Sequence, residues 1–444
     1  MIFRVFILRY ICVNKREYKL SFRNNLKWSS VGTIARYLIQ TASIVVLARI
    51  LTPIDFGVVS ASLVIINFLT TLAQFGAAQL IVTTDEDKLG AVVFQSLLLS
   101  TVLSLCFMTA VYVFADYVSN AISHEDISNY IKMLIPVIFF KSITTTFEGI
   151  QVKKARFKYI AIASSASFIV GYFFVALILA LCGMQLWSLI IATLVQTLLY
   201  LLILISSLSK LENIIVISFQ HFIDNLKKSI LISYSQMVSN LTGQVDNYFV
   251  SKFIGLETLG IYSRAYQLMV VPCNFIGQMV NQVFLKEFTV GNEIKNSKII
   301  KQSLLLITLM SFFVVSVVHF LGRDLIFILL GSGWEAIQVP LLILSLSIYP
   351  RMLYKIGEPI LYSNRSFSSV AIYSSIYFSI IVILLIALVS HGVSGIAVAV
   401  LLGTIIYGLS MSIKVVRLYP DTKRTFGLTL AIYIVIVGMV FIYG

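Results

Sequence analysis

The strongest constraint on the fold is a succession of about thirteen apolar stretches, each roughly 18–25 residues long, the length that crosses a bilayer as a helix. A backbone in lipid must satisfy its own hydrogen bonds, so helices are expected, whereas barrel strands would be shorter and strictly alternating. The sequence therefore predicts an all-α, polytopic membrane protein. The expected spans lie near residues 29–50, 56–78, 89–115, 129–149, 159–181, 186–207, 229–251, 259–283, 303–321, 337–356, 369–390, 393–413 and 426–443.

Composition and charge agree with this prediction. Of the 444 residues, 59% are hydrophobic and 12% are charged, against ~25% charged residues in soluble domains. Of the 33 Lys and Arg residues, 25 fall in the N-terminal segment and alternate loops, whereas the opposite loops hold only Lys252 and Arg323. Because basic loops stay in the cytoplasm, we expect a cytoplasmic N-terminus. The net charge of +14 is then topogenic and faces lipid headgroups, and it does not indicate nucleic-acid binding.

The chain also repeats itself after about 200 residues. Asn25-Leu26-Lys27-Trp28-Ser29 returns as Asn225-Leu226-Lys227-Lys228-Ser229. Both copies continue into one polar helix face, because the following polar positions step by 3, 4 and 3 residues. The remaining equivalences, at offsets of 200 and then 203, are Thr33, Arg36, Gln40 and Ser43 with Ser233, Gln236, Asn240 and Gly243, Arg49-Ile50-Leu51 with Lys252-Phe253-Ile254, Phe56-Gly57-Val58 with Leu259-Gly260-Ile261, and Ser60 with Ser263.

This duplication predicts two pseudo-symmetric lobes of six helices, related by an axis along the membrane normal, with a polar cleft between them. The predicted parts are a basic cytoplasmic segment (1–27), an N-terminal lobe (28–207), an amphipathic cytoplasmic linker (208–228), a C-terminal lobe (229–416) and an extra, thirteenth span (417–444). Such an arrangement is typical of transporters.

Polar residues inside the spans are the candidate site, because polar and charged groups in lipid are costly and usually face the bundle interior or water. The alternative for Asn and Gln is hydrogen bonding between helices, worth ~0.6 kcal/mol per contact. The substrate-binding candidates are Arg36, Gln40, Arg49, Lys141, Gln236, Asn240, Asp246, Lys252, Arg264, Gln267 and Asn274.

The cations among these candidates favour an anionic substrate, because guanidinium forks match phosphate oxygens. Arg49 and Lys252 could instead snorkel to the interface, and Lys141 and Arg351 could pair structurally. Two roles are open for Asp246: neutralising Lys252 or Arg264, or binding a proton or sodium ion. Glu148 and Glu358, near cytoplasmic ends, are expected to be solvated.

Catalytic and cofactor motifs are not expected in this chain. The four His residues are dispersed, the four Cys residues show no metal-binding spacing, and no nucleotide-binding motif is evident. We therefore predict no enzyme activity, cofactor or metal, so that any pumping draws on an ion, voltage or substrate gradient.

Several blocks of the sequence resemble the polysaccharide repeat-unit flippases of the multidrug/oligosaccharidyl-lipid/polysaccharide exporter superfamily. These blocks are Ala48-Arg49-Ile50-Leu51-Thr52-Pro53-Ile54-Asp55-Phe56-Gly57, the basic loop Gln151 to Arg156-Phe157-Lys158, Gln244-Val245-Asp246-Asn247, Gly255, and Leu259-Gly260-Ile261-Tyr262-Ser263-Arg264-Ala265-Tyr266. The resemblance covers most of residues 25–420. It implies two six-helix lobes forming a V in the bacterial cytoplasmic membrane, alternating access, and an undecaprenyl-diphosphate-linked oligosaccharide as substrate. Membrane lipids and a polysaccharide polymerase are the expected partners, with Arg49, Asp246 and Arg264 on motif positions.

Two other functions are alternatives. A cation-coupled multidrug exporter of the same superfamily would favour acids over arginines in its cavity, whereas this chain has one central acid and several bases. A membrane polysaccharide polymerase or ligase would be expected to carry a large outer loop with catalytic groups, and the loops predicted here are short.

Overall fold

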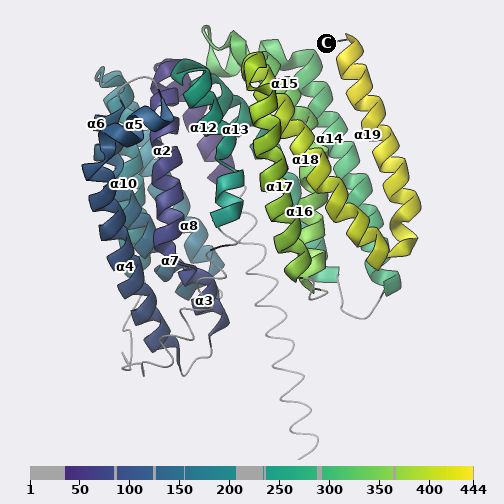
Figure 1. Cartoon of the computed structure of the whole chain (residues 1–444), viewed down its shortest axis with the longest axis horizontal. Coiled ribbons are helices and arrows are strands. Elements are labelled where there is room, and N and C mark those ends of the chain that lie inside the picture. Colours follow the sequence, from purple (N-terminus) through teal and green to yellow (C-terminus); the bar gives the residue numbers. More distant parts are fainter. Residues whose placement is uncertain are drawn as a thin grey trace, which may run out of the picture.

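We analysed a computed structural model of the chain, which describes residues 36–84, 88–123, 127–154, 156–206, 234, 237–287, 293–363 and 367–443. Within these ranges the secondary structure is helical (Figure 1). The predicted basic segment 1–27, the predicted linker 208–228 and the candidate Gln236 lie outside the described residues.

The N-terminal lobe forms the left-hand bundle in Figure 1. Its fifth span contains one turn of π-helix, η2, packed against α10 through Gly171. The elements of this lobe are a helix from Arg36 to Ala48, α2 (Pro53–Gln74), α3 (Ala77–Thr83), α4 (Leu89–Val113), α5 (Ala115–Ile122), α6 (Ser128–Leu134), α7 (Pro136–Lys153), α8 (Phe157–Phe168), η2 (Ile169–Val175), α9 (Ala176–Leu181) and α10 (Gln185–Ser206).

The C-terminal lobe forms the right-hand bundle, with α12 and α13 at the boundary and α19 on the outer flank (Figure 1). Helix α19 packs on α14, on the side of the lobe away from the other bundle. The elements are a helix at 237–242, α12 (Val245–Phe253), α13 (Leu256–Glu287), α14 (Glu293–Leu330), η3 (Glu335–Ile337), α15 (Gln338–Leu346), α16 (Ile348–Ser363), α17 (Phe367–Leu388), η4 (Val389–His391), α18 (Gly392–Leu418), η5 (Pro420–Thr422) and α19 (Lys423–Tyr443).

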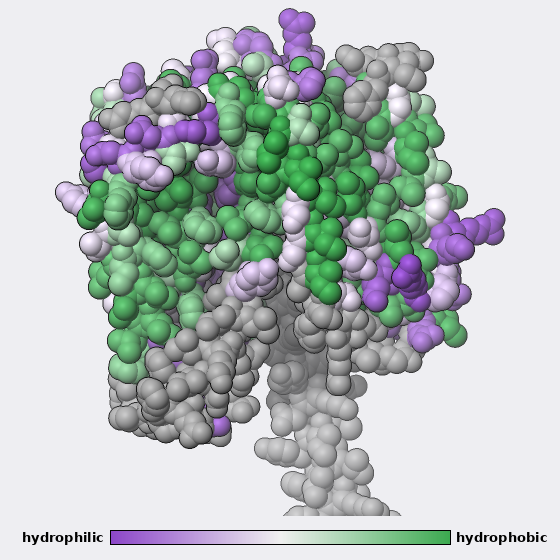
Figure 2. All heavy atoms as spheres, in the orientation of Figure 1, coloured by the Kyte–Doolittle hydropathy of each residue, from purple (hydrophilic) through white to green (hydrophobic). Residues whose placement is uncertain are grey.

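The outer surface is that of a multi-pass membrane protein, as the sequence predicts. Apolar residues cover the flanks of both bundles, and hydrophilic residues gather near the rims (Figure 2). Large apolar side chains such as Phe173, Phe313 and Phe320 are exposed there, which lipid explains and water does not. Each of the thirteen expected ranges overlaps a described helix. By length and apolar composition, eight helical stretches in the described part qualify as spans, or nine with the bent pair α15–α16.

The sequence around Thr52 explains how α2 begins. Thr52 is the N-cap, and its backbone N–H donates to the Asp55 carboxylate at 2.9 Å in a capping box. Pro53 occupies the first helical position, where a missing N–H costs nothing. The Thr-Pro-Ile-Asp sequence in the family-like block therefore fixes the turn between the first two helices of the lobe.

The fourth span of each lobe is interrupted. In the N-terminal lobe α6 gives way to α7 at Ile135, before Pro136. In the C-terminal lobe the axes on either side of Ser347 differ by 42°. The carbonyl of Leu346, at this bend, accepts a hydrogen bond of 3.0 Å from the Tyr433 hydroxyl on α19. The residue four positions on is Pro350, which has no N–H, so the extra helix supplies the donor that the Leu346 carbonyl lacks within its own helix.

Candidate functional site

The two lobes meet where α2 crosses α13, near the end at which both helices begin (Figure 1). Gly57 and Gly260 lie at the crossing, and their backbones touch. A Cβ atom on Gly57 would lie 1.8 Å from the carbonyl oxygen of Leu256, and one on Gly260 would lie 1.8 Å from that of Pro53. Only glycine allows this approach.

The crossing unites equivalent positions of the repeat. Gly57 faces Gly260, and the Ser60 hydroxyl donates to the Ser263 hydroxyl at 3.2 Å. Both pairs are equivalences that the sequence duplication predicts. The pseudo-twofold axis therefore passes between α2 and α13.

Arg264 reaches from α13 into the N-terminal lobe. Its guanidinium carbon lies 4.7 Å from the centre of the Phe56 ring on α2, a cation–π contact. Its charge also interacts with Tyr172 of the π-helical segment. The buried Nε finds no hydrogen-bond partner in the part of the chain that the structure describes. A permanent cation with a free donor thus stands at the boundary of the lobes.

A second cationic group lies within the N-terminal lobe. The Lys141 ammonium on α7 donates to the Asn67 side chain on α2 at 3.0 Å. The charge of Arg36 acts on both Lys141 and Glu148, and Glu148 also interacts with the Tyr200 hydroxyl. Glu148 is half-buried here, so the expectation that it is solvated was wrong.

Arg49 and Lys252 lie at the end of the bundle where α2 and α13 begin. The guanidinium of Arg49 donates to the Ile328 carbonyl on α14, and the ammonium of Lys252 donates to the Asn120 carbonyl on α5. Each cation therefore contacts the opposite lobe, so snorkelling does not account for its position.

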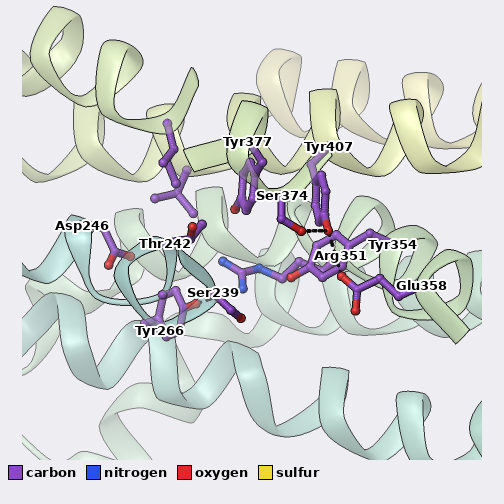
Figure 3. Close-up of a pocket in the computed structure, with 13 residues that line it drawn as sticks. Ser239, Thr242, Asp246, Tyr266, Arg351, Tyr354, Glu358, Ser374, Tyr377 and Tyr407 are labelled. Atoms are coloured by element: carbon purple, nitrogen blue, oxygen red, sulfur yellow. Dashed lines mark hydrogen bonds between the residues drawn. The ribbon is translucent and has the colours of Figure 1, made fainter. Parts of the chain in front are cut away.

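Asp246 lies elsewhere, in a polar pocket of the C-terminal lobe (Figure 3). Its carboxylate accepts a hydrogen bond of 2.8 Å from the Tyr262 hydroxyl and interacts electrostatically with Arg351. Lys252 and Arg264 have the other contacts described above, so the predicted neutralisation of either by Asp246 was wrong. The physical reason is that α12 turns the Asp246 carboxylate into its own lobe.

Arg351 occupies the centre of this pocket, whose volume is about 170 Å³. It donates to the Tyr266 hydroxyl at 2.9 Å and to the Ser347 hydroxyl at 3.2 Å. Glu358 accepts from the Tyr407 hydroxyl at 2.9 Å, so it too is not fully solvated. The pocket therefore holds one guanidinium, two carboxyl groups and several phenols within one lobe.

Sequence reasoning missed two groups. The phenols of Tyr354, Tyr377 and Tyr407, which line the pocket, carry no charge and so did not stand out among 22 tyrosines. Lys355, which is not among the candidate residues, donates to the candidate Asn274 at 2.7 Å inside the lobe. A signal existed for Lys355, because it follows Pro350 by the same five residues that separate Pro136 from Lys141.

For three further candidates the structure gives the degree of burial. Gln40, Asn240 and Gln267 are half-buried. The structure thus places most of the candidate residues in three locations. These are a cationic group in the N-terminal lobe and at the lobe boundary, the contacts of Arg49 and Lys252 between the lobes at one end, and a pocket in the C-terminal lobe.

Two helical lobes joined along duplicated helices, each holding buried polar groups, define a transporter-type membrane fold, and solved structures share it. The lipid II flippase MurJ in an inward closed conformation matches with a TM-score of 0.74 and 16% identity, over 93% of this chain and 91% of that one. An inward-facing multidrug resistance MATE family transporter of the MOP superfamily matches with a TM-score of 0.70 and 13% identity, over 88% and 95%.

The sequence identifies the family. A family model described as "Polysaccharide biosynthesis protein" matches residues 46–339, and the chain belongs to this family. The succinoglycan biosynthesis transport protein ExoT of Rhizobium meliloti (strain 1021) is 24% identical over 73% of this chain, which spans 65% of that relative's length. The lipopolysaccharide biosynthesis protein WzxC of Escherichia coli (strain K12) is 20% identical over 75% of this chain and 68% of its own.

Proposed function

We propose that this protein is a flippase that carries undecaprenyl-diphosphate-linked oligosaccharide units across the bacterial cytoplasmic membrane by alternating access. The units serve the synthesis of a surface polysaccharide. In this proposal the N-terminus is cytoplasmic, the protein has no catalytic activity of its own, and a membrane polysaccharide polymerase uses the delivered units. Membership of the polysaccharide biosynthesis family supports the substrate class.

The observation that carries the proposal is the buried, incompletely paired cation at the lobe boundary. Arg264 has a buried Nε without a partner among the described residues, and its neighbours Phe56 and Tyr172 are uncharged. A desolvated guanidinium of this kind favours an anion that supplies acceptors, and a diphosphate supplies several. Lys141 and Arg36, whose charges interact, add positive charge within the N-terminal lobe.

Reconstitution tests the proposal directly. The full chain is placed in liposomes with a fluorescent short-chain polyprenyl-diphosphate disaccharide, and a membrane-impermeant reductant bleaches the outer leaflet. Active protein should allow bleaching of more than half of the fluorescence. Arg264→Gln should slow this exchange by about tenfold, which corresponds to one charge-assisted hydrogen bond.

The control is Arg323→Gln, which removes an exposed cation on α14 and should leave the rate unchanged. Bleaching that stops at half with the diphosphate lipid, in liposomes that export a cationic drug, would replace the proposal with the multidrug alternative.

A further inference from the structure

Besides the Ser60–Ser263 bond at the crossing, three hydrogen bonds between described residues join the lobes at the end where α2 and α13 begin, and these three have the same form. Arg49 donates to the carbonyl of Ile328, Lys252 donates to the carbonyl of Asn120, and the Trp334 indole donates to the carbonyl of Ala48 at 2.9 Å. In each case the donor is a side chain of one lobe and the acceptor is backbone of the other.

The acceptors share a location as well. Ile328 lies in the last turn of α14, Asn120 in the last turn of α5, and Ala48 ends the helix that begins at Arg36. The last carbonyls of a helix have no helical partner and carry the negative end of the helix dipole. A cation or N–H group supplied by the other lobe satisfies both requirements while the lobes touch.

The two cationic contacts are related by the sequence repeat. Arg49 and Lys252 are equivalent positions of the repeat; Arg49 directly follows the helix from Arg36 to Ala48, and Lys252 lies in the last turn of α12. Helix α14 and the pair α4–α5 each form the third span of their lobes. The cation of each lobe, Arg49 or Lys252, therefore donates to the end of the other lobe's third span, so the two contacts are reciprocal.

We propose that Arg49 and Lys252 form a reciprocal latch that closes this end of the transporter, with Trp334 as its apolar support. Trp334 is fully buried and packs edge-on against Phe56, 5.6 Å between ring centres. When the lobes separate, water must replace the opposite lobe at both carbonyl ends, and both cations become free. The latch thus sets the balance between the closed and open states of this end. The inference rests on alternating access in the proposed function.

A labelling experiment without substrate tests the latch. In the full chain in lipid discs, Cys12, Cys106 and Cys182 are replaced by Ser, and Ser60→Cys places a reporter at the lobe crossing. Arg49→Gln and Lys252→Gln should each raise the rate of maleimide labelling about two- to fivefold, the range for a charge at a helix end. Because the sites are separate, the double variant should show roughly the product of the two effects.

Lys132→Gln is the matched control. Lys132 lies in the N-terminal lobe and pairs with Asp116 of the same lobe at 3.4 Å, so its loss should leave the labelling rate unchanged. Arg49→Lys and Lys252→Arg keep a cation and should label at the parental rate, which separates the latch from a folding defect. Parental rates in both Gln variants, or an equal rise with Lys132→Gln, would overturn the inference. Since no substrate is present, this outcome is independent of the test of transport.

Discussion

The fourth spans of the two lobes share one polar contact and differ in the residues that precede it. In each, a lysine lies five residues after a proline and donates to an asparagine of its lobe's second span: Lys141 to Asn67 at 3.0 Å, and Lys355 to Asn274 at 2.7 Å. Only the C-terminal span adds Arg351, one turn earlier, together with a bend of 42°.

The two sites differ in the groups around the cation. In the C-terminal lobe the Arg351 guanidinium is held by Tyr266 and Ser347, and its charge acts on Asp246 in the same pocket. In the N-terminal lobe the charge that acts on Lys141 is that of another cation, Arg36, which also interacts with Glu148. We therefore propose that the C-terminal pocket stabilises its lobe and that the N-terminal group binds the anion.

Removal of Arg351 should have the largest effect on stability. Arg351→Met removes the two hydrogen bonds that the guanidinium donates to Tyr266 and Ser347, and hydrogen bonds to a charged group contribute about 1.5–3 kcal/mol each. Steric trapping in lipid discs would measure the free energy of unfolding. Arg323→Met, at an exposed position, is the control, and an equal loss in both variants would remove the distinction between the lobes.

Gly260→Ala should have the next largest effect. Its Cβ would lie 1.8 Å from the Pro53 carbonyl, and overpacking of this kind costs about 1–3 kcal/mol, more than alanine gains in a helix. Gly277→Ala in the same helix meets nothing nearer than Lys355 at 3.8 Å. The same unfolding measurement should find this control neutral or stabilised. A neutral Gly260→Ala would show that the lobes do not touch by backbone.

Tyr433→Phe should cost about 1 kcal/mol, because it removes the hydroxyl that donates to Leu346 but keeps the ring stacked on Tyr349 at 4.8 Å. Thermal unfolding in detergent would report the change. The exposed Tyr112→Phe, which should not shift the midpoint, is the comparison. Identical midpoints would mean that α19 does not brace the bend.

Lys141→Met should have the smallest effect on stability, below about 1 kcal/mol, because a half-buried cation in lipid is itself unfavourable. The liposome exchange of the diphosphate lipid should nevertheless fall. A variant that unfolds easily yet transports at the wild-type rate while folded would reverse the roles assigned to the two lobes.

Much of the fold could be predicted from the sequence, since apolar length and basic loops follow directly from the bilayer. The repeat equivalences of Gly57 with Gly260 and of Ser60 with Ser263 likewise anticipated the crossing. The partners of polar residues could not be predicted in the same way. Asp246 turned into its own lobe because rotation of a helix about its axis depends on packing that spacing does not reveal.

The contacts of Arg49 and Lys252 escaped prediction for another reason. Their acceptors are backbone carbonyls, Ile328 and Asn120, which have no signature in side-chain chemistry. The tyrosine pocket was missed because phenols are as common at membrane interfaces as in interiors. Charge and spacing therefore point to polar positions inside the bundle, but they do not reveal which groups those residues contact.

The bond from Tyr433 to Leu346 also bears on how the protein is made. Apart from its contacts with the C-terminal lobe, the packing partners of the N-terminal lobe lie early in the chain, so its interior can form while translation continues. The C-terminal lobe cannot, because its bent fourth span waits for α19, some eighty residues later, to supply the missing donor. Insertion of α19 is thus a step on which the bent span of the second lobe depends, and a ribosome stalled before α19 would leave the Leu346 carbonyl without this donor.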